Sequence, residues 1–282
     1  MTNSSTAINP HAAQPTSLVA LGKSLWRNRQ LIVQMTKREV IGRYRGSVMG
    51  LLWSFFNPIL MLIVYTFVFS IVFKARWVGG GDSKTEFALV LFAGLLVFNL
   101  FSECVNRAPS LILSNINYVK KVIFPLEILP LVALGSAVFH FMIGLLVWLM
   151  FYLIFFGIPP ATILLLPLIL MPLILMTLGF SWLLASLGAY LRDVGQIISV
   201  VTTVLMFLSP IFYPIAALPE EYRPYMQISP LTFVVEQARD LMMWGRGIDW
   251  DGWVMWMAVS SVITWMGFAW FQKTRKGFAD VL

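Results

Sequence analysis

The sequence predicts an all-α polytopic membrane protein that crosses the bilayer six times. The chain is 59% hydrophobic and 12% charged, whereas an ordinary soluble domain is about 45–50% apolar and about 25% charged. Two long stretches, Ser47 to Phe73 and Ile128 to Leu191, contain no charged residue. A crossing needs about 20 apolar residues. Because the bilayer offers no water to backbone amides, each crossing must be helical.

The chain begins with a polar segment and continues with an amphipathic one. Residues 1–17 are expected to form a mobile tail and show no apolar core of a signal peptide. Residues 18–46 alternate apolar and basic positions, with Leu21 and Leu25 at helical spacing and Lys23 and Arg27 directed elsewhere. This pattern predicts an interfacial helix whose basic side faces lipid phosphates. A soluble helix packed on a partner fits the same pattern.

One short match to a nucleotide-binding motif lies in this helix. Gly22-Lys23-Ser24 resembles the end of the phosphate-binding loop G-x-x-x-x-G-K-[ST]. Position 17 is Ser rather than Gly, and no apolar strand precedes the match. We therefore expect no nucleotide site here.

The membrane domain is expected to cover residues 47–272. Its six spans are predicted at about residues 51–73, 87–102, 128–156, 162–190, 195–212 and 253–271. Asn57-Pro58 removes a backbone donor from the first span and should kink or loosen it. The turn Gly157-Ile158-Pro159-Pro160 separates the third span from the fourth.

The region between the fifth and sixth spans has a different composition. Five prolines, Pro210, Pro214, Pro219, Pro224 and Pro230, punctuate an aromatic stretch, and Leu231 to Trp244 is expected to form a further short helix. Neither piece is long and apolar enough to cross the membrane. We expect short re-entrant or surface helices on the external side, buried in protein rather than lipid.

The distribution of basic residues predicts the orientation. Of the 20 lysines and arginines, 14 lie in segments assigned to the inside and 6 in segments assigned to the outside. This excess places both termini in the cytoplasm. The C-terminal one is a short tail at residues 273–282. We expect the protein to lie in the cytoplasmic (inner) membrane. The same rule accounts for the net charge of +7, so we expect no nucleic-acid partner.

Few residues are suited to catalysis or metal binding. The chain has one cysteine, Cys104, and two histidines, His11 and His140, too few for a Cys- or His-based metal site. No nucleophile–base pair or carboxylate pair is evident, so no catalytic residue is assigned. His140 lies near the middle of the third span, where a hydrogen-bonded packing role and a proton-relay role are both open.

A transporter without an internal energy source must be passive or be driven by another polypeptide. The loop at residues 107–127 is both amphipathic and basic, with Lys120-Lys121 followed by Phe124-Pro125. This loop and the basic N-terminal helix offer a cytoplasmic partner a surface to act on. A simple interfacial helix is the alternative interpretation of the loop.

Four segments have patterns that point to one family. They are Arg43 to Trp53 (RYRGSVMGLLW) followed by Asn57-Pro58, Asn115 to Pro125 (NINYVKKVIFP), Tyr190 to Val194 (YLRDV) and Ser229 to Thr232 (SPLT). Together they resemble the membrane (permease) subunits of ATP-binding-cassette (ABC) polysaccharide exporters. The resemblance extends from about Leu18 to the end of the chain.

The resemblance implies a function and a set of partners. It implies a homodimer bound to two copies of a separate ATPase, which would hold ATP and Mg while this chain binds no cofactor. The substrate would be a lipid-linked polysaccharide such as O-antigen, teichoic acid or capsule, which is moved from the cytoplasm to the outer face of the membrane. Membrane lipids would surround the subunit. The implied ATPase-coupling residues lie in the loop at residues 107–127 and are Asn115, Asn117, Tyr118, Lys120, Lys121 and Phe124.

The same resemblance suggests where the substrate passes. Arg43 and Arg45 would hold the pyrophosphate of the substrate, although anchoring to lipid phosphates explains them equally. Aromatic rings can stack on sugars, and the channel-lining candidates are Trp53, Phe55, Phe56, Tyr65, Tyr213 and Tyr225. Most tryptophans are expected at the membrane interfaces.

Three rival functions stay open at this point. The first is an ABC exporter of a drug or simple lipid with the same fold. The second is an intramembrane lipid-modifying enzyme centred on His140. The third is a membrane scaffold without transport activity.

Overall fold

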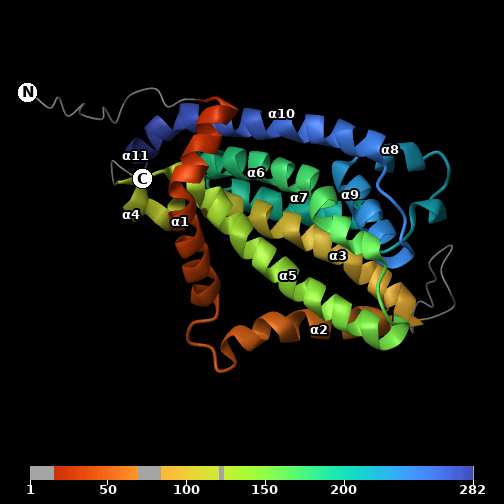
Figure 1. The fold of residues 1–282 in the computed structure, drawn as a ribbon. Helices are drawn as coiled ribbons and strands as arrows, with labels where there is room; N and C mark the ends of the chain where they lie inside the picture. The colour runs from red at the N-terminus through yellow and green to blue at the C-terminus, as the bar shows by residue number, and fades with distance from the viewer. Residues whose placement is uncertain (1–15, 69–83, 121–123, 282) are drawn as a thin grey trace, which may run out of the picture.

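The computed structural model describes residues 16–68, 84–120 and 124–281, and over these ranges the chain is helical with no β-strand. The long helices are α1 (Leu18–Arg43), α2 (Trp53–Tyr65), α3 (Lys84–Arg107), α5 (Leu129–Phe156), α6 (Leu166–Tyr190), α7 (Val194–Leu208) and α10 (Trp250–Thr274). Helices α3, α5, α6, α7 and α10 run side by side, while α1 crosses one end of them and α2 lies along one edge (Figure 1). The predicted all-α fold class is confirmed.

Short helices fill the connections between these elements. They are η1 (Gly50–Leu52), η3 (Ala108–Ser110), η4 (Leu113–Asn115), α4 (Ile116–Val119), η5 (Leu126–Ile128), η6 (Ala161–Leu165), η7 (Ile215–Ala217), α8 (Arg223–Gln227), α9 (Pro230–Arg239), η8 (Asp240–Trp244), η9 (Arg275–Gly277) and α11 (Phe278–Val281). Helices α4 and α11 lie near α1, and α8 and α9 lie at the opposite end of the bundle (Figure 1).

Five segments in the described part of the chain are long and apolar enough to cross a membrane. They are Gly50–Val68, Thr85–Ser110, Leu126–Phe156, Ala161–Tyr190 and Trp250–Gly277. A polytopic helical membrane protein is therefore confirmed. The predicted fifth span, at about residues 195–212, corresponds to helix α7, which has 15 residues, fewer than the roughly 20 that a crossing needs. The count of six stays a prediction.

Helix α1 begins at a side-chain cap and ends at a sharp corner. The Oγ of Ser17 accepts a hydrogen bond from the amide of Ala20 at 3.2 Å, which satisfies one free amide of the first turn. The predicted mobile tail lies largely outside the described residues. Between α1 and α2 the chain turns through Gly46 and Gly50, whose φ angles are 86° and 53°. Only glycine adopts such angles without strain, so these two residues allow the corner.

Helices α6 and α10 form a close helix pair. A Cβ atom at Gly179 would lie 2.6 Å from the carbonyl oxygen of Ile263, and one at Gly267 would overlap the carbonyl oxygen of Gly179. Glycine at both positions lets the two backbones touch. Beside them, the hydroxyl of Thr264 donates a hydrogen bond to the carbonyl of Leu175 at 2.7 Å.

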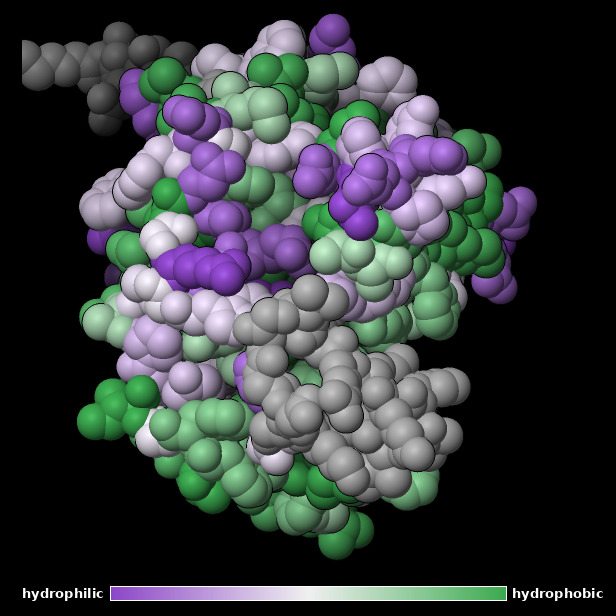
Figure 2. Space-filling view, turned by 90° about the vertical axis from the view of Figure 1, so that its right-hand side faces the viewer, coloured by the Kyte–Doolittle hydropathy of each residue, from purple (hydrophilic) through white to green (hydrophobic). Residues whose placement is uncertain are grey.

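The end of the bundle at α8 and α9 contains a buried arginine. Arg239 is completely buried, and its guanidinium donates hydrogen bonds to the carbonyls of Val90, Pro210 and Ile211 and to the carboxylate of Glu236. These bonds tie α9 to α3 and to the turn after α7. Figure 2 views this end and shows hydrophilic side chains gathered on its upper part, with apolar ones on the flanks.

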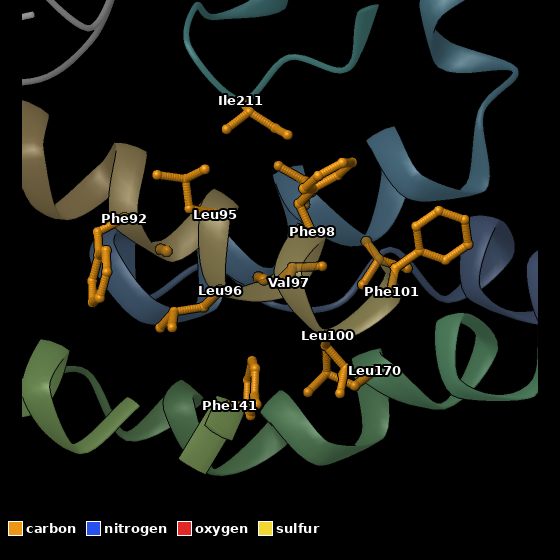
Figure 3. Close-up of a cluster of buried hydrophobic side chains, with 14 of the residues drawn as sticks. Phe92, Leu95, Leu96, Val97, Phe98, Leu100, Phe101, Phe141, Leu170 and Ile211 are labelled. Atoms are coloured by element: carbon orange, nitrogen blue, oxygen red, sulfur yellow. The ribbon is translucent and has the colours of Figure 1, made fainter. Parts of the chain in front are cut away.

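Helix α3 forms the centre of the packed core. Its side chains meet Phe141 of α5, Leu170 of α6 and Ile211 of the turn after α7 (Figure 3). On another side the indole N–H of Trp148 in α5 donates a hydrogen bond to the carbonyl of Leu89 at 3.1 Å. Helix α3 is therefore in contact with several other elements and is the central helix of the bundle.

Candidate substrate cleft and partner-docking surface

The described part of the predicted coupling segment, residues 115–120, 124 and 125, lies at the end of the bundle near α1. The rings of Tyr118 and Phe124 stack with centroids 4.4 Å apart and an interplanar angle of 10°. A guanidinium N–H of Arg38, on α1, donates to the hydroxyl of Tyr118 at 3.3 Å. The amide of Asn115 donates to the carbonyl of Leu111 at 2.8 Å. These predicted coupling residues thus have structural contacts within the chain.

Other predicted coupling residues face outward. Asn117 and Lys120 are exposed, so they are available to a partner. Lys121 lies outside the described residues. The segment therefore combines aromatic side chains that are bonded within the chain with exposed polar side chains. Exposed polar groups are common at the rim of a protein interface.

A buried carboxylate fixes this segment to three other elements. Glu127 is 6% exposed, and a guanidinium N–H of Arg275 donates to its Oε2 at 2.7 Å. The hydroxyl of Ser24 on α1 donates to Oε1 at 2.9 Å. Arg275 also donates to the carbonyl of Phe124 at 2.8 Å, and the indole of Trp182 donates to the carbonyl of Glu127 at 3.0 Å. We refer to Glu127, Arg275 and Ser24 as the cytoplasmic node, because the sequence predicts the cytoplasmic side for this end of the bundle.

The sequence did not reveal the cytoplasmic node. Glu127 is an isolated acidic residue directly before the uncharged stretch that begins at Ile128. This position is the only signal that could have singled it out. Its partner Arg275 lies 148 positions away, and one sequence gives no means of pairing them.

A second feature is a cleft of about 460 Å³ between α2, α3 and α5. Its lining is mixed, with apolar rings beside amide, hydroxyl and charged groups. The polar lining residues are Arg43, Tyr44, Ser54, Asn57, Tyr65, Asn99, Ser102, Glu103, Asn106, Arg107 and His140. The volume falls in the range of about 300–1,000 Å³ that is usual for ligand sites.

Charged groups gather at the mouth of the cleft, where the corner after α1 meets α3 and α5. Arg43 forms an ion pair with Glu103 at 2.7 Å. The Nδ1 atom of His140 lies 3.0 Å from both oxygens of Glu103, and the hydroxyl of Tyr44 lies 3.1 Å from Nε2. Arg107 pairs with Glu39 of α1. We refer to Arg43, Glu103 and His140 as the cleft triad.

The cleft contains two charged residues of α3 that were placed outside the second span by the sequence. Glu103 and Arg107 were expected just beyond the second span, but α3 continues to Arg107 and the apolar segment to Ser110. Both charges therefore belong to this helix, and each has a partner of opposite sign. His140 has a polar contact at each ring nitrogen, which a hydrogen-bonded packing role and a proton-relay role both predict. Burial raises the pKa of Tyr44, so its phenol stays protonated at neutral pH.

The predicted channel-lining residues do not form one cluster. Trp53, Phe55 and Phe56 are exposed on α2, and only Tyr65 from this set lines the cleft. The hydroxyl of Tyr213 donates to the carbonyl of Phe207 at 3.0 Å.

Two other predicted residues lie at the surface. Tyr225 is 74% exposed, and Arg45 is exposed beside the corner. Within the ranges that the structure describes, no three or more His, Cys, Asp and Glu side chains gather in a possible metal site.

Comparison with known proteins gives a consistent result. The family described as ABC-2 type transporter matches residues 30–243. The O-antigen export system permease protein RfbA of Myxococcus xanthus is 26% identical over 265 residues, which cover 93% of this chain and 99% of that protein. A protein of the same name from Klebsiella pneumoniae is 26% identical over 254 residues, 89% of this chain and 95% of that protein. The polysialic acid transport protein KpsM of Escherichia coli is 24% identical over 211 residues, 74% and 79% of the two chains.

Proposed function

This chain belongs to the ABC-2 type transporter family, and from that premise we propose that it is the permease subunit of an ATP-driven exporter of lipid-linked polysaccharide. The observation that carries the proposal is the alignment with an O-antigen export permease over 93% of this chain and 99% of that protein. The similarity to a polysialic acid transport protein points to the same class of cargo. The cargo would be O-antigen or a similar cell-surface glycan.

The active assembly would be a homodimer of this chain with two copies of a separate ATPase. ATP and Mg would bind to the ATPase, and this subunit would carry no catalytic residue. Helices α2 and α7 support such an assembly because each exposes a row of large apolar side chains. A second copy and membrane lipids would cover these rows. With α7 as a sixth crossing, both termini would lie in the cytoplasm.

The ATPase would dock on the coupling segment and on α1. The exposed side chains of Asn117 and Lys120 are available for this contact. The stacked rings of Tyr118 and Phe124 would give the segment the stiffness to transmit a push. From there the cytoplasmic node would pass the movement to α1 and to the end of α10, because Glu127 is bonded to Ser24 and Arg275.

Two arginines are candidates for the pyrophosphate of the substrate, and their surroundings differ. Arg45 is exposed and carries its charge next to the corner after α1. Arg43 is already paired with Glu103, so a phosphate would have to displace that carboxylate. We therefore assign first contact to Arg45 and later contact to Arg43. The aromatic residues of α2, with Tyr213 and Tyr225, would line the route outward.

The central test is co-expression with any candidate ATPase that is encoded by the genes next to this one. We expect the two to copurify and to restore surface polysaccharide in cells that lack both, in a way that needs an intact ATPase. Copurification with export of a drug or simple lipid but no glycan would favour the first rival function. An ATPase-independent change of a membrane lipid that is lost in His140→Ala would favour the enzyme. Failure of the chain to bind any ATPase would contradict the proposal.

The docking role is tested by charge reversal. Lys120→Glu with Lys121→Glu should weaken the ATPase complex and reduce export while membrane insertion is unchanged. The matched control is Arg192→Glu, which reverses another exposed charge outside the coupling segment and should leave the complex intact. Undiminished complex formation and export in the double variant would remove the docking role from these lysines.

A further inference from the structure

One face of α3 is polar although the helix lies at the centre of the packed core. Asn99, Ser102, Glu103 and Asn106 follow each other at intervals of three, one and three residues, so they form a single stripe along the helix. All four line the cleft. Asn99 and Asn106 are exposed, whereas Phe98 and Leu100, on either side of Asn99, are buried. We refer to these four residues as the polar stripe.

The facing wall of the cleft has a matching group. Asn57 of α2 is exposed and lines the same cleft. Within the described ranges the side-chain amides of Asn57 and Asn99 form no hydrogen bond to other protein groups. Each amide offers two donors and an acceptor. The two walls therefore present unused hydrogen-bonding capacity to whatever occupies the cleft.

The charges in the cleft indicate which kind of ligand this capacity suits. The cations Arg43 and Arg107 are neutralised by Glu103 and Glu39. An anionic headgroup would have to compete with these carboxylates, whereas a hydroxyl-rich neutral ligand would not. The rings of Tyr65 and Phe92 in the same lining provide flat apolar surfaces beside the amides. Amides next to aromatic rings match a sugar, which has hydroxyl groups around its edge and C–H groups on its faces.

We propose that the polar stripe, together with Asn57, is a binding track for the sugar residues of the exported polysaccharide. Most of the track runs along α3, and Tyr65 is the one expected channel-lining residue that lines the same cleft. Sugar hydroxyl groups bond in turn to Asn99, Ser102 and Asn106 as the chain advances. Neutral hydrogen bonds of modest strength hold each sugar without trapping it. The inference rests on the proposed export function and adds the site at which the glycan is held.

The first experiment compares two substitutions at Asn99 in the complete complex with its ATPase. Asn99→Leu removes the amide at nearly constant size, and Asn99→Gln keeps it. We expect Asn99→Leu to reduce surface polysaccharide about threefold to tenfold, the effect of one lost hydrogen bond, and Asn99→Gln to export near the wild-type level. Wild-type export by Asn99→Leu would overturn the track while leaving the export function intact. Absence of export by the wild-type complex would instead contradict the proposed function.

The second experiment detects occupancy without relying on export. Cys104 is the only cysteine and is buried, so Ser102→Cys introduces one accessible thiol in the polar stripe. Its reaction with a charged maleimide should slow severalfold when lipid-linked polysaccharide, extracted from cells that lack the exporter, is added to the complex. Ser17→Cys, at the exposed start of α1, should react at an unchanged rate.

A lipid-only control separates the sugar from its carrier. The organic phase of the same extract after mild acid hydrolysis contains the lipid without the glycan. It should leave the labelling of Ser102→Cys unchanged. Equal protection by this lipid phase, or no protection by the intact extract, would overturn the assignment of the stripe to sugar.

Discussion

Helices α2 and α3 belong to segments of similar hydropathy but lie in opposite surroundings. The apolar segments that contain them have mean hydropathies of 1.9 and 2.1, but 11% of the first is buried inside the subunit and 83% of the second. Hydropathy therefore indicates that a segment can enter a membrane but not which neighbours it will have. In a bilayer this is expected, because lipid tails are as apolar as leucine side chains.

The difference in burial suggests that α2 and α3 have different roles in the subunit. Helix α3 receives hydrogen bonds from Trp148 and Arg239 on its backbone carbonyls, so its position is fixed by specific contacts. Helix α2 turns exposed apolar side chains such as Leu60 and Ile63 outward. Substitutions of buried apolar residues in α3 should therefore lower the stability of the subunit, whereas substitutions of exposed apolar residues in α2 should affect assembly or transport.

The largest expected effect is at the arginine that anchors α3. Arg239→Met removes a buried guanidinium and leaves Glu236 and three carbonyls without their donor. Burial lowers the pKa of Arg239, but the group stays charged at neutral pH. We expect a loss of about 3–5 kcal/mol in the free energy of unfolding, measured in detergent. Arg246→Met, which breaks the exposed pair with Asp240, should cost at most about 1 kcal/mol; equal losses would contradict this view of α3.

A matched pair of leucines tests the two helices directly. Leu91 in α3 is fully buried and Leu60 in α2 is 48% exposed. Leu91→Ala should lower the free energy of unfolding by about 2 kcal/mol, at the low end for a core leucine. The reason is that the unfolded helix stays in an apolar solvent and loses mainly packing. Leu60→Ala should leave subunit stability unchanged, and a similar loss at both sites would show that α2 belongs to the core.

The smallest effect concerns α7, which shares the exposure of α2. The hydroxyl of Tyr213 donates to the carbonyl of Phe207 near the end of this helix. Tyr213→Phe removes that bond and should reduce stability by about 1 kcal/mol, visible as a small downward shift of the melting temperature. An additional defect in export would assign the hydroxyl to the path. An unchanged melting temperature would indicate that water replaces the bond.

The sequence predicted those features that depend on local composition. The uncharged stretch from Ile128 to Leu191 and its Gly-Pro turn correspond to α5 and α6, with ends at Phe156 and Tyr190. The extent of the fifth span could not be derived in the same way. Apolar residues continue to Phe212, but α7 ends at Leu208, after which Ser209 has an extended backbone.

The candidate sites were predicted less completely. The second span was predicted to end at Ser102, so Glu103 and Asn106 were placed beyond it and were not connected with Asn99. Their role as one wall of a cleft depends on the positions of α2 and α5. Likewise, Glu127 and Arg275 are joined only in the folded chain. Tertiary pairs of this kind cannot be read from one sequence.

The corner between α1 and α2 can change its angle without disturbing the packing around it. A Cβ atom at Gly46 or Gly50 would meet no other atom within 4 Å, so torsion angles, not crowding, fix the bend. Alanine at either position would stiffen or reshape this joint without disturbing neighbouring side chains. The angle between α1 and α2 can thus be changed at two positions where an added methyl group would meet no neighbouring side chain.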